Sequence, residues 1–185
     1  MAPIKNVIFD LGGVLIDVDY NKTSKAFHAL GVENFDQLYR QSFSNPLFAD
    51  LEKGLIDSST FYNKLRETTG IVSPDESIET AWNAMLGAFR KDSLSFLSVL
   101  KKRANIYLLS NTNSIHHKAF TLIYTENFGN NNFDTCFHKA YYSHVINCRK
   151  PDVESYQIIL NDNNISAAET LFIDDTKENI LGAQK

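Results

Sequence analysis

Cysteine is scarce in this chain, and long apolar segments are missing. Cys136 and Cys148 are the only two cysteines among 185 residues, and no metal-ligand spacing surrounds them. This argues against a disulfide framework and against a zinc site, so we expect both thiols to be free. The chain has no uncharged apolar run of about 18 residues, and its first residues lack the apolar segment of a signal peptide. We therefore expect a soluble, cytoplasmic protein with no membrane partner.

Positive charge is not in excess either. The 18 lysines and arginines are outnumbered by 22 acidic residues, which gives a net charge of -4. We find neither a basic stripe nor an aromatic RNA-reading motif, so we expect no nucleic-acid partner. Any anionic substrate then has to be held by local groups. What the chain does contain is 43% hydrophobic residues, enough for a packed core in one domain, or in one domain with a sizeable insertion.

Short apolar runs alternate with helical patterns along most of the chain. We expect strands at residues 4–9, 105–109, 138–142 and 170–173. We expect helices at residues 92–103, 114–128, 152–160 and 176–183. This alternation predicts an α/β fold, a Rossmann-like parallel sheet with helices on both faces. Right-handed crossovers then bring the carboxyl ends of the strands to one edge, where such sheets bind ligands.

The segment 18–89 breaks this alternation, because it has several helical signals and no convincing strand. We interpret it as an inserted helical cap, with residues 1–17 and 90–185 forming the core. Four residues recur at helical spacing and are expected to pack inside the cap: Trp82, Met85, Leu86 and Phe89. Other aromatic residues could line a pocket or fill the cap core, and we expect the core for most of them: Phe27, Tyr39, Phe43 and Phe48.

Capping signals predict two helix boundaries inside this segment. Ser73-Pro74-Asp75-Glu76 is a capping box with proline at the first helical position. Asp57 or Ser58 is expected to begin a second helix, which ends at Gly70.

A carboxylate follows the first predicted strand. The apolar run Val7-Ile8-Phe9 leads into Asp10, with Gly12 and Gly13 close behind. Apolar residues in such a run favour a buried strand, and paired glycines allow a turn and let a ligand approach the backbone. Two interpretations stay open here: a strand that presents an acid at its tip, or a strand that runs into an ordinary glycine turn.

The other predicted strands also end near polar residues. Ser110-Asn111-Thr112-Asn113 begins a helix, where backbone N–H groups favour an anion, although the same pattern is typical of a helix N-cap. Lys150 stands just ahead of Pro151, which is expected to initiate a helix, and on its own it would be a solvated charge. Asp174 and Asp175 repel each other and need a cation or a proton to lie close together.

These four motifs, in this order, resemble the haloacid dehalogenase superfamily of phosphohydrolases. The resemblance covers the whole chain, and the insertion after the first motif is similar to the helical cap of the superfamily's first cap class. The motifs look most like the bacterial glucose-1-phosphatase-like branch, and they are Phe9-Asp10-Leu11-Gly12-Gly13-Val14, Leu109-Ser110-Asn111-Thr112-Asn113, Arg149-Lys150-Pro151, and Ile173-Asp174-Asp175 with Asn179. In this fold a further strand is expected after Lys185.

The resemblance implies a nucleophile and a metal site. It makes Asp10 the nucleophile that attacks phosphorus and forms an aspartyl-phosphate intermediate. Mg²⁺ would be held by Asp10, by the backbone carbonyl of Gly12 and by Asp175. Asp174 would be a second metal ligand, or it would accept a hydrogen bond from a water molecule bound to the metal.

The resemblance also implies how the phosphoryl group is held. Ser110 and adjoining backbone N–H groups, including that of Asn111, would bind its non-bridging oxygens, and Gly12 would also contact the phosphoryl group. Lys150 would neutralise charge on the phosphoryl group and on the nucleophile. In the expected strand order, the first strand lies between the second and the fourth.

Gly12 departs from the pattern. Many phosphatases of the superfamily have an aspartate at this position as general acid and then base, a role worth roughly 10²–10⁴-fold in rate. Here the leaving group could depart with little help, as the anomeric oxygen of a sugar 1-phosphate would. Another group could supply the proton, with Asp17, Asp19 and His28 as weak candidates. Or the chain is no longer a phosphatase.

We therefore predict an enzyme, a Mg²⁺-dependent phosphatase for a small phosphorylated metabolite, for example a hexose 1-phosphate. The alternatives are a 2-haloacid dehalogenase and a non-catalytic binding protein on the same scaffold. Asp174-Asp175 favours the phosphatase over the dehalogenase, because a nucleophile that attacks carbon without a metal gains nothing from an acid pair. Retention of all four motifs argues against the non-catalytic protein. Monomer and homodimer both stay open.

Overall fold

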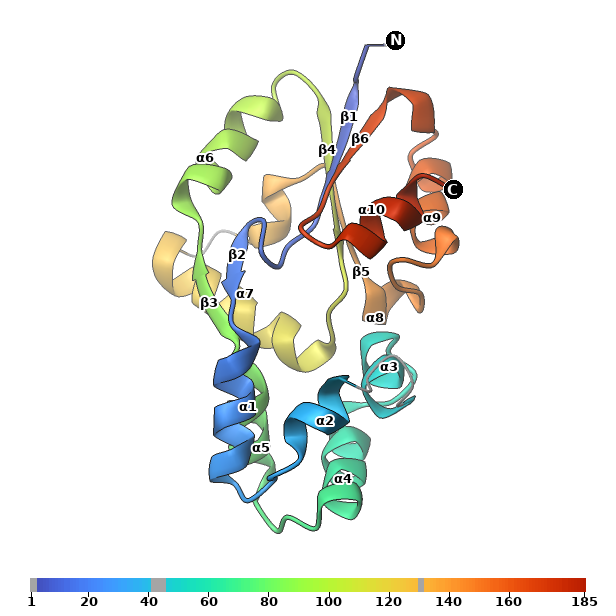
Figure 1. The fold of residues 1–185 in the computed structure, drawn as a ribbon. Coiled ribbons are helices and arrows are strands. Elements are labelled where there is room, and N and C mark those ends of the chain that lie inside the picture. Colours follow the sequence, from blue (N-terminus) through green and yellow to red (C-terminus); the bar gives the residue numbers. More distant parts are fainter. Residues whose placement is uncertain (1–2, 41–45, 130–131) are drawn as a thin grey trace.

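The computed structural model of the protein describes residues 3–40, 46–129 and 132–185 and consists of an α/β core and a helical cap (Figure 1). The strands of the core sheet run toward the cap, which lies beyond their carboxyl ends. None of the helices in these three ranges is both long and apolar enough to span a bilayer. Both cysteines are free.

Parallel strands form the core sheet in the order β5-β4-β1-β6. They are β1 (Asn6–Phe9), β4 (Asn105–Ser110), β5 (Lys139–Tyr142) and β6 (Thr170–Ile173). The predicted α/β class and all four predicted strands are confirmed, and β1 lies between β4 and β6 as expected. Asp10, Ser110 and Asp174 therefore come to the same edge of the sheet.

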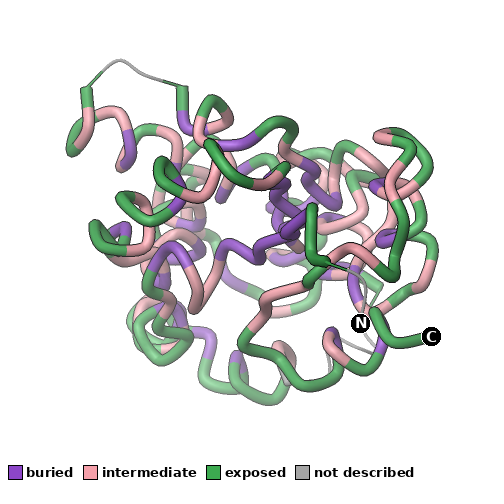
Figure 2. The backbone as a smooth tube through the Cα atoms, turned by 90° about the horizontal axis from the view of Figure 1, so that it is seen from above, coloured by how far each residue is buried: buried purple, intermediate pink, exposed green. Residues whose placement is uncertain are grey.

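Helices cover both faces of this sheet. They are α6 (Lys91–Leu100), α7 (Ser114–Phe128), α8 (Ser143–Ile146), α9 (Val153–Asp162) and α10 (Lys177–Ala183), with 3-10 turns at Phe133–Cys136 and Ala167–Glu169. Side chains alternate along β1, so Val7 and Phe9 pack with α6 and α7, whereas Ile8 packs with α9. Burial on both faces explains why the run is continuously apolar. Figure 2 shows the buried residues concentrated along these central strands.

The cap has an aromatic core of its own. Its helices are α1 (Tyr20–Ala29), α2 (Phe35–Arg40), α3 (Pro46–Glu52), α4 (Ser58–Thr69) and α5 (Asp75–Asn83). Trp82 stacks on Phe48 with ring centroids 5.4 Å apart, and Phe27 is fully buried beside them. The core position expected for Phe27 and Phe48 is confirmed. Tyr39 packs against this core and also lines a cavity, and Phe43 lies outside the described residues.

Two short strands outside the main sheet link the cap to the core. They are β2 (Ile16–Val18) and β3 (Leu86–Phe89), and they pair antiparallel. The prediction of a strand-free segment with one helical face reaching Phe89 is therefore wrong. Helix α5 ends at Asn83, and Phe89 packs with the hydrophobic residues of the α/β core rather than with those of the cap. The reason is that β3 is stabilised by a partner far away in the sequence, which local periodicity does not register.

One of the two capping predictions is confirmed and the other is wrong. Asp57 caps α4 by accepting a hydrogen bond from a backbone N–H of the first turn at 2.8 Å, and Gly70 ends that helix with a φ of 74°. At α5 the N-cap is Pro74, so Ser73 lies one residue too early to reach the first N–H groups. The Ser73 carbonyl instead accepts from Nε of Arg66 at 2.9 Å.

Candidate active site

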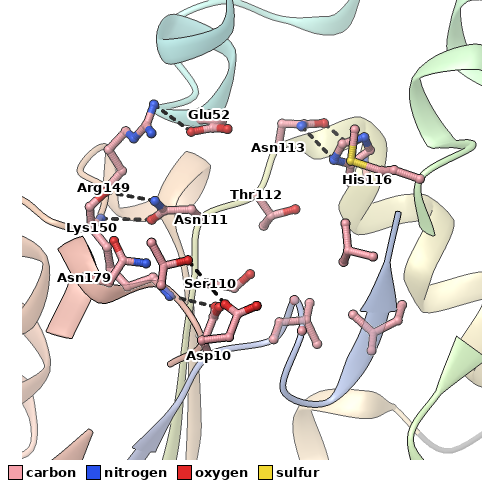
Figure 3. Close-up of a pocket in the computed structure, with 18 of the residues that line it drawn as sticks. Asp10, Glu52, Ser110, Asn111, Thr112, Asn113, His116, Arg149, Lys150 and Asn179 are labelled. Atoms are coloured by element: carbon pink, nitrogen blue, oxygen red, sulfur yellow. Dashed lines mark hydrogen bonds and ion pairs between the residues drawn. The ribbon is translucent and has the colours of Figure 1, made fainter. Parts of the chain in front are cut away.

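Asp10 lies at the carboxyl end of β1, at one end of a cavity of about 420 Å³ that core and cap residues line together (Figure 3). Only 8% of Asp10 is exposed, and Lys150 is 1% exposed. Nζ of Lys150 lies 2.7 Å from Oδ1 of Asp10 and 2.6 Å from Oδ2 of Asp174. One buried ammonium thus joins two carboxylates that follow different strands.

Burial controls the protonation of Asp10. Its pKa is raised from 3.8 to about 6, because removal from water raises the pKa more than Lys150 lowers it, and the negative charge of Asp174 raises it as well. The ionised form is therefore costly in this site, and a divalent cation beside it would favour that form.

Asp174 is held from several sides. Its side chain is fully buried and accepts from Lys150, from Nδ2 of Asn179 at 3.0 and 3.1 Å, and from the backbone N–H of Thr176 at 2.8 Å. Among the described residues that line the cavity, Asp175 is present and Asp174 is not. This geometry favours the second of the two roles predicted for Asp174, that of an acceptor behind the metal ligands.

Gly13 makes room for Asp175. The glycine has a φ of 69°, and a Cβ atom there would lie 1.9 Å from Oδ2 of Asp175, so a side chain is excluded by both backbone conformation and space. Carboxylate oxygens of Asp10, Asp174 and Asp175 all lie within 4.8 Å of one another. This set of oxygen donors fits a hard cation such as Mg²⁺, which keeps several waters.

Two neighbouring loops are tied together by Asn111. Its Nδ2 donates to the carbonyl of Lys150, and its Oδ1 accepts from the backbone N–H of Lys150, both at 2.9 Å. The peptide bond between Lys150 and Pro151 is cis, and Pro151 precedes α9 without initiating it, which corrects the prediction. The side chain of Asn111 therefore positions Lys150. Only the backbone N–H of Asn111 is left for the predicted contact with phosphate.

Ser110 is where the prediction places it. It is the last residue of β4, it is buried, and it lines the cavity beside Asp10. The backbone N–H of Thr112 donates to Oγ of Ser143 at 2.9 Å, so this donor of the motif is used inside the protein.

His116 links the first turn of α7 to the last turn of α5. Its Nε2 lies 3.1 Å from the carbonyl oxygen of Trp82, and its Nδ1 lies 3.2 Å from Nδ2 of Asn113. Because a carbonyl only accepts, Nε2 carries the proton and Nδ1 accepts from the amide, so the ring is neutral. Oδ1 of Asn113 caps α7 by accepting from the N–H groups of Ile115 and His116, as the N-cap interpretation predicts.

The neutral His116 is expected to reduce stability in acid. Burial lowers its pKa from 6.5 to about 4. Between these values the unfolded chain binds a proton that the native chain excludes, so the free energy of unfolding should fall as the pH falls, by at most about 1.4 kcal/mol per pH unit. Urea unfolding at about pH 7 and about pH 5 measures this slope. The variant His116→Gln should lack it, and parallel pH dependence of variant and wild type would contradict the expectation.

The three weak candidates for the proton donor do not face the nucleophile. Asp17 pairs with Arg90 at 2.7 Å, Asp19 caps α1, and His28 lies 3.4 Å from Asp36. None of these three candidates is among the described residues that line the cavity.

Glu52 and Tyr20 are among the cavity-lining residues that no sequence motif singles out. Glu52 is the last residue of α3, and Tyr20 is the first residue of α1. Neither belongs to a motif at a strand end. Both reach the cavity because the cap folds over the core, and no local pattern in the sequence signals that contact.

Comparison with known proteins points to one family. The family described as haloacid dehalogenase-like hydrolase matches residues 4–185. The chain is 30% identical over 177 residues to a D-ribitol-5-phosphate phosphatase of Bacteroides thetaiotaomicron, covering 96% of this chain and 85% of that protein. It is 30% identical over 187 residues to a sesquiterpene phosphatase of Aspergillus oryzae, covering 97% and 85%.

A solved structure gives the same picture. It is a HAD family enzyme from Bacteroides thetaiotaomicron, an aspartate-to-alanine variant in complex with magnesium and inorganic phosphate. It matches this chain with a TM-score of 0.92 at 33% identity, and the match covers 98% of this chain and 89% of that chain.

Proposed function

This chain belongs to the haloacid dehalogenase-like hydrolases, and on that premise we propose that it is a Mg²⁺-dependent phosphatase acting on a small phosphorylated metabolite through an aspartyl-phosphate intermediate. The observation that carries the proposal is the joining of Asp10 and Asp174 by the buried Lys150, within a cluster of three carboxylates. The phosphatases among its relatives and the magnesium and phosphate bound by a structural neighbour support it.

The residues around the cavity floor divide the proposed reaction among them. Asp10 attacks phosphorus while the bond to the leaving-group oxygen breaks and that oxygen takes up a proton from solvent, and water then hydrolyses the aspartyl phosphate to free phosphate. Lys150 holds one oxygen of Asp10 at 2.7 Å and neutralises charge that gathers between nucleophile and phosphoryl group. The hydroxyl of Ser110 and the backbone N–H of Asn111 donate to non-bridging oxygens. Asp174 keeps Lys150 in place through the bond at 2.6 Å.

The metal would be held at the same edge. Asp10, Asp175 and the carbonyl of Gly12 are its proposed ligands, with Asp174 as an acceptor through water. When bound, Mg²⁺ neutralises phosphoryl charge and favours the ionised form of Asp10.

The alternatives fit the site less well. A dehalogenase has no use for an acid cluster beside a nucleophile that attacks carbon, and a non-catalytic protein has no need for a buried lysine held between two acids. The absence of a nucleic-acid partner and a cytoplasmic location stay predictions from composition. Monomer and homodimer stay open.

Hydrolysis of p-nitrophenyl phosphate tests the proposal. Turnover is expected with Mg²⁺, with a loss of at least about 10²-fold in EDTA that excess Mg²⁺ reverses. Glucose 1-phosphate is expected to react faster than glucose 6-phosphate, because Gly12 supplies no proton to a poor leaving group. Turnover that EDTA does not affect would contradict the metal site. Halide release from 2-chloropropionate in EDTA would favour the dehalogenase instead.

A further inference from the structure

Glu52 faces the catalytic residues from the other side of the cavity. It ends α3 of the cap and lines the same cavity as Asp10 and Lys150 (Figure 3). The position is fixed from behind, since a Cβ on Gly54 would lie 2.2 Å from the carbonyl oxygen of His144 in α8. The end of α3 therefore rests directly on the core.

The carboxylate of Glu52 has unused acceptor capacity. Its Oε2 lies 2.8 Å from Nη1 of Arg149, and the two side chains are 20% and 15% exposed. Apart from this ion pair, buried Oε2 receives no hydrogen bond of good geometry from the described residues. A carboxylate can accept about four hydrogen bonds, so most of its sites are open. Burial raises the pKa of Glu52, and the positive charges of Arg149 and Lys150 oppose that shift.

Aromatic rings line the same cavity. Tyr20 lies 5.9 Å from Tyr39, and Tyr39 lies 5.7 Å from Trp82, measured between ring centroids. Tyr20 is 57% exposed and lines the cavity together with Tyr39 and Trp82. Flat apolar rings pack against C–H groups, while an open carboxylate needs O–H donors.

We propose that Glu52 accepts hydrogen bonds from hydroxyl groups of the substrate's leaving group, so that the enzyme selects neutral polyhydroxylated monophosphates, the polyol and sugar phosphates. The inference rests on the proposed phosphatase function and adds the substrate class.

The charges of the cavity select by exclusion as well. A hydrocarbon leaving group would cover Glu52 and leave its carboxylate buried without donors. A second anionic group on the substrate would compete with Glu52 for Arg149 and disrupt their ion pair. A site built to bind hydroxyl groups rejects an analogue that lacks them far more strongly than an apolar pocket rejects a hydroxyl.

A competing explanation is that Glu52 and Arg149 only fasten the cap to the core. Other contacts also join the cap to the core at this interface. Nδ2 of Asn147 donates to the carbonyl of Lys53 at 2.8 Å, and Nζ of Lys53 lies 3.6 Å from Asp152. Lys53 is not among the described residues that line the cavity. It therefore offers a matched control, a cap–core ion pair that does not touch substrate.

The experiment compares Glu52→Gln with Lys53→Gln on three substrates in the presence of Mg²⁺. Ribitol 5-phosphate carries hydroxyl groups, pentyl phosphate has the same five-carbon chain without them, and p-nitrophenyl phosphate reports the chemistry alone. We expect the wild type to prefer ribitol 5-phosphate over pentyl phosphate by about 10²-fold or more in kcat/KM. Glu52→Gln should lower kcat/KM for ribitol 5-phosphate by about 10- to 100-fold, and it should not lower kcat/KM for the two substrates without hydroxyl groups, because these no longer cover a buried charge.

The other possible outcomes separate the inference from a structural role of Glu52. An equal loss on all three substrates in Glu52→Gln would mean that the residue only fastens the cap and would overturn the inference, as would a selective loss reproduced by Lys53→Gln. Retained turnover of p-nitrophenyl phosphate by Glu52→Gln shows that the variant is folded. If the wild type hydrolyses p-nitrophenyl phosphate but does not prefer ribitol 5-phosphate over pentyl phosphate, the inference fails and the proposed function stands. No turnover of any phosphate by the wild type would overturn both.

Discussion

Replacing Asp10 with asparagine is expected to lower phosphate hydrolysis by roughly 10⁴-fold or more, because an amide cannot form the acyl-phosphate intermediate. The same change should leave the fold at least as stable. Burial raises the pKa of Asp10 from 3.8 to about 6, so at neutral pH the native state holds an ionised group that the unfolded state holds more favourably. Removing that charge should raise the free energy of unfolding by roughly 1–3 kcal/mol.

Urea unfolding of the two proteins in EDTA measures this gain, and steady-state hydrolysis in Mg²⁺ measures the loss of activity. EDTA matters because a bound cation would itself relieve the cost of the carboxylate. The gain should shrink as the pH falls through about 6, where the native Asp10 takes up a proton. Residual turnover near that of the wild type would overturn the assignment of Asp10 as nucleophile, and a less stable variant would contradict the cost assigned to its charge.

Replacing Lys150 with methionine is expected to remove activity and to destabilise the fold as well. The lysine is 1% exposed and pairs with both Asp10 and Asp174. Its removal leaves two buried carboxylates without their cation, which should lower the free energy of unfolding by roughly 3–5 kcal/mol in EDTA. Because the site then carries more negative charge, Mg²⁺ should raise the Tm of the variant more than that of the wild type.

Lys139→Met is the matched control, since Lys139 pairs with Asp162 at the surface, where both side chains are about half exposed. An exposed pair of this kind should contribute less than about 1 kcal/mol. Equal losses of stability in the two variants would show that burial of Lys150 between the acids is not what makes it matter. A smaller response to Mg²⁺ in Lys150→Met than in the wild type would contradict the placement of the metal at this edge.

The catalytic edge of the sheet could be predicted from the sequence, because its residues directly follow short apolar runs. Asp10 follows β1 and Asp174 follows β6, while Ser110 ends β4. A strand fixes the position of the residue that follows it, so a local pattern is enough to place these groups together once the sheet is recognised as parallel. The side-chain bonds of Asn111, which lies between Ser110 and its helix, depend on the neighbouring loop and could not be predicted in this way.

The cap side of the site could not be predicted, because its contacts join parts of the chain that are distant in sequence. Glu52 reaches the cavity only through the packing of α3 on α8, where Gly54 meets the backbone of His144. For the same reason, the spacing of apolar residues predicts a helix at Leu86–Phe89, although these residues form β3 and pair with β2. Helical periodicity describes one segment at a time, whereas the packing of α3 on α8 and the pairing of β2 with β3 each involve two distant segments.

The paired hydrogen bonds between the Asn111 side chain and the Lys150 backbone have a mechanical consequence. The loop after β4 carries the backbone N–H of Asn111 that is proposed to touch the phosphoryl oxygens, and the loop after α8 carries Lys150, whose ammonium holds Asp10. Since one amide bridges the two loops as both donor and acceptor, neither loop can shift alone without breaking both bonds. The Asn111 side chain therefore ties the backbone donor proposed for the phosphoryl oxygens to the lysine that holds the nucleophile.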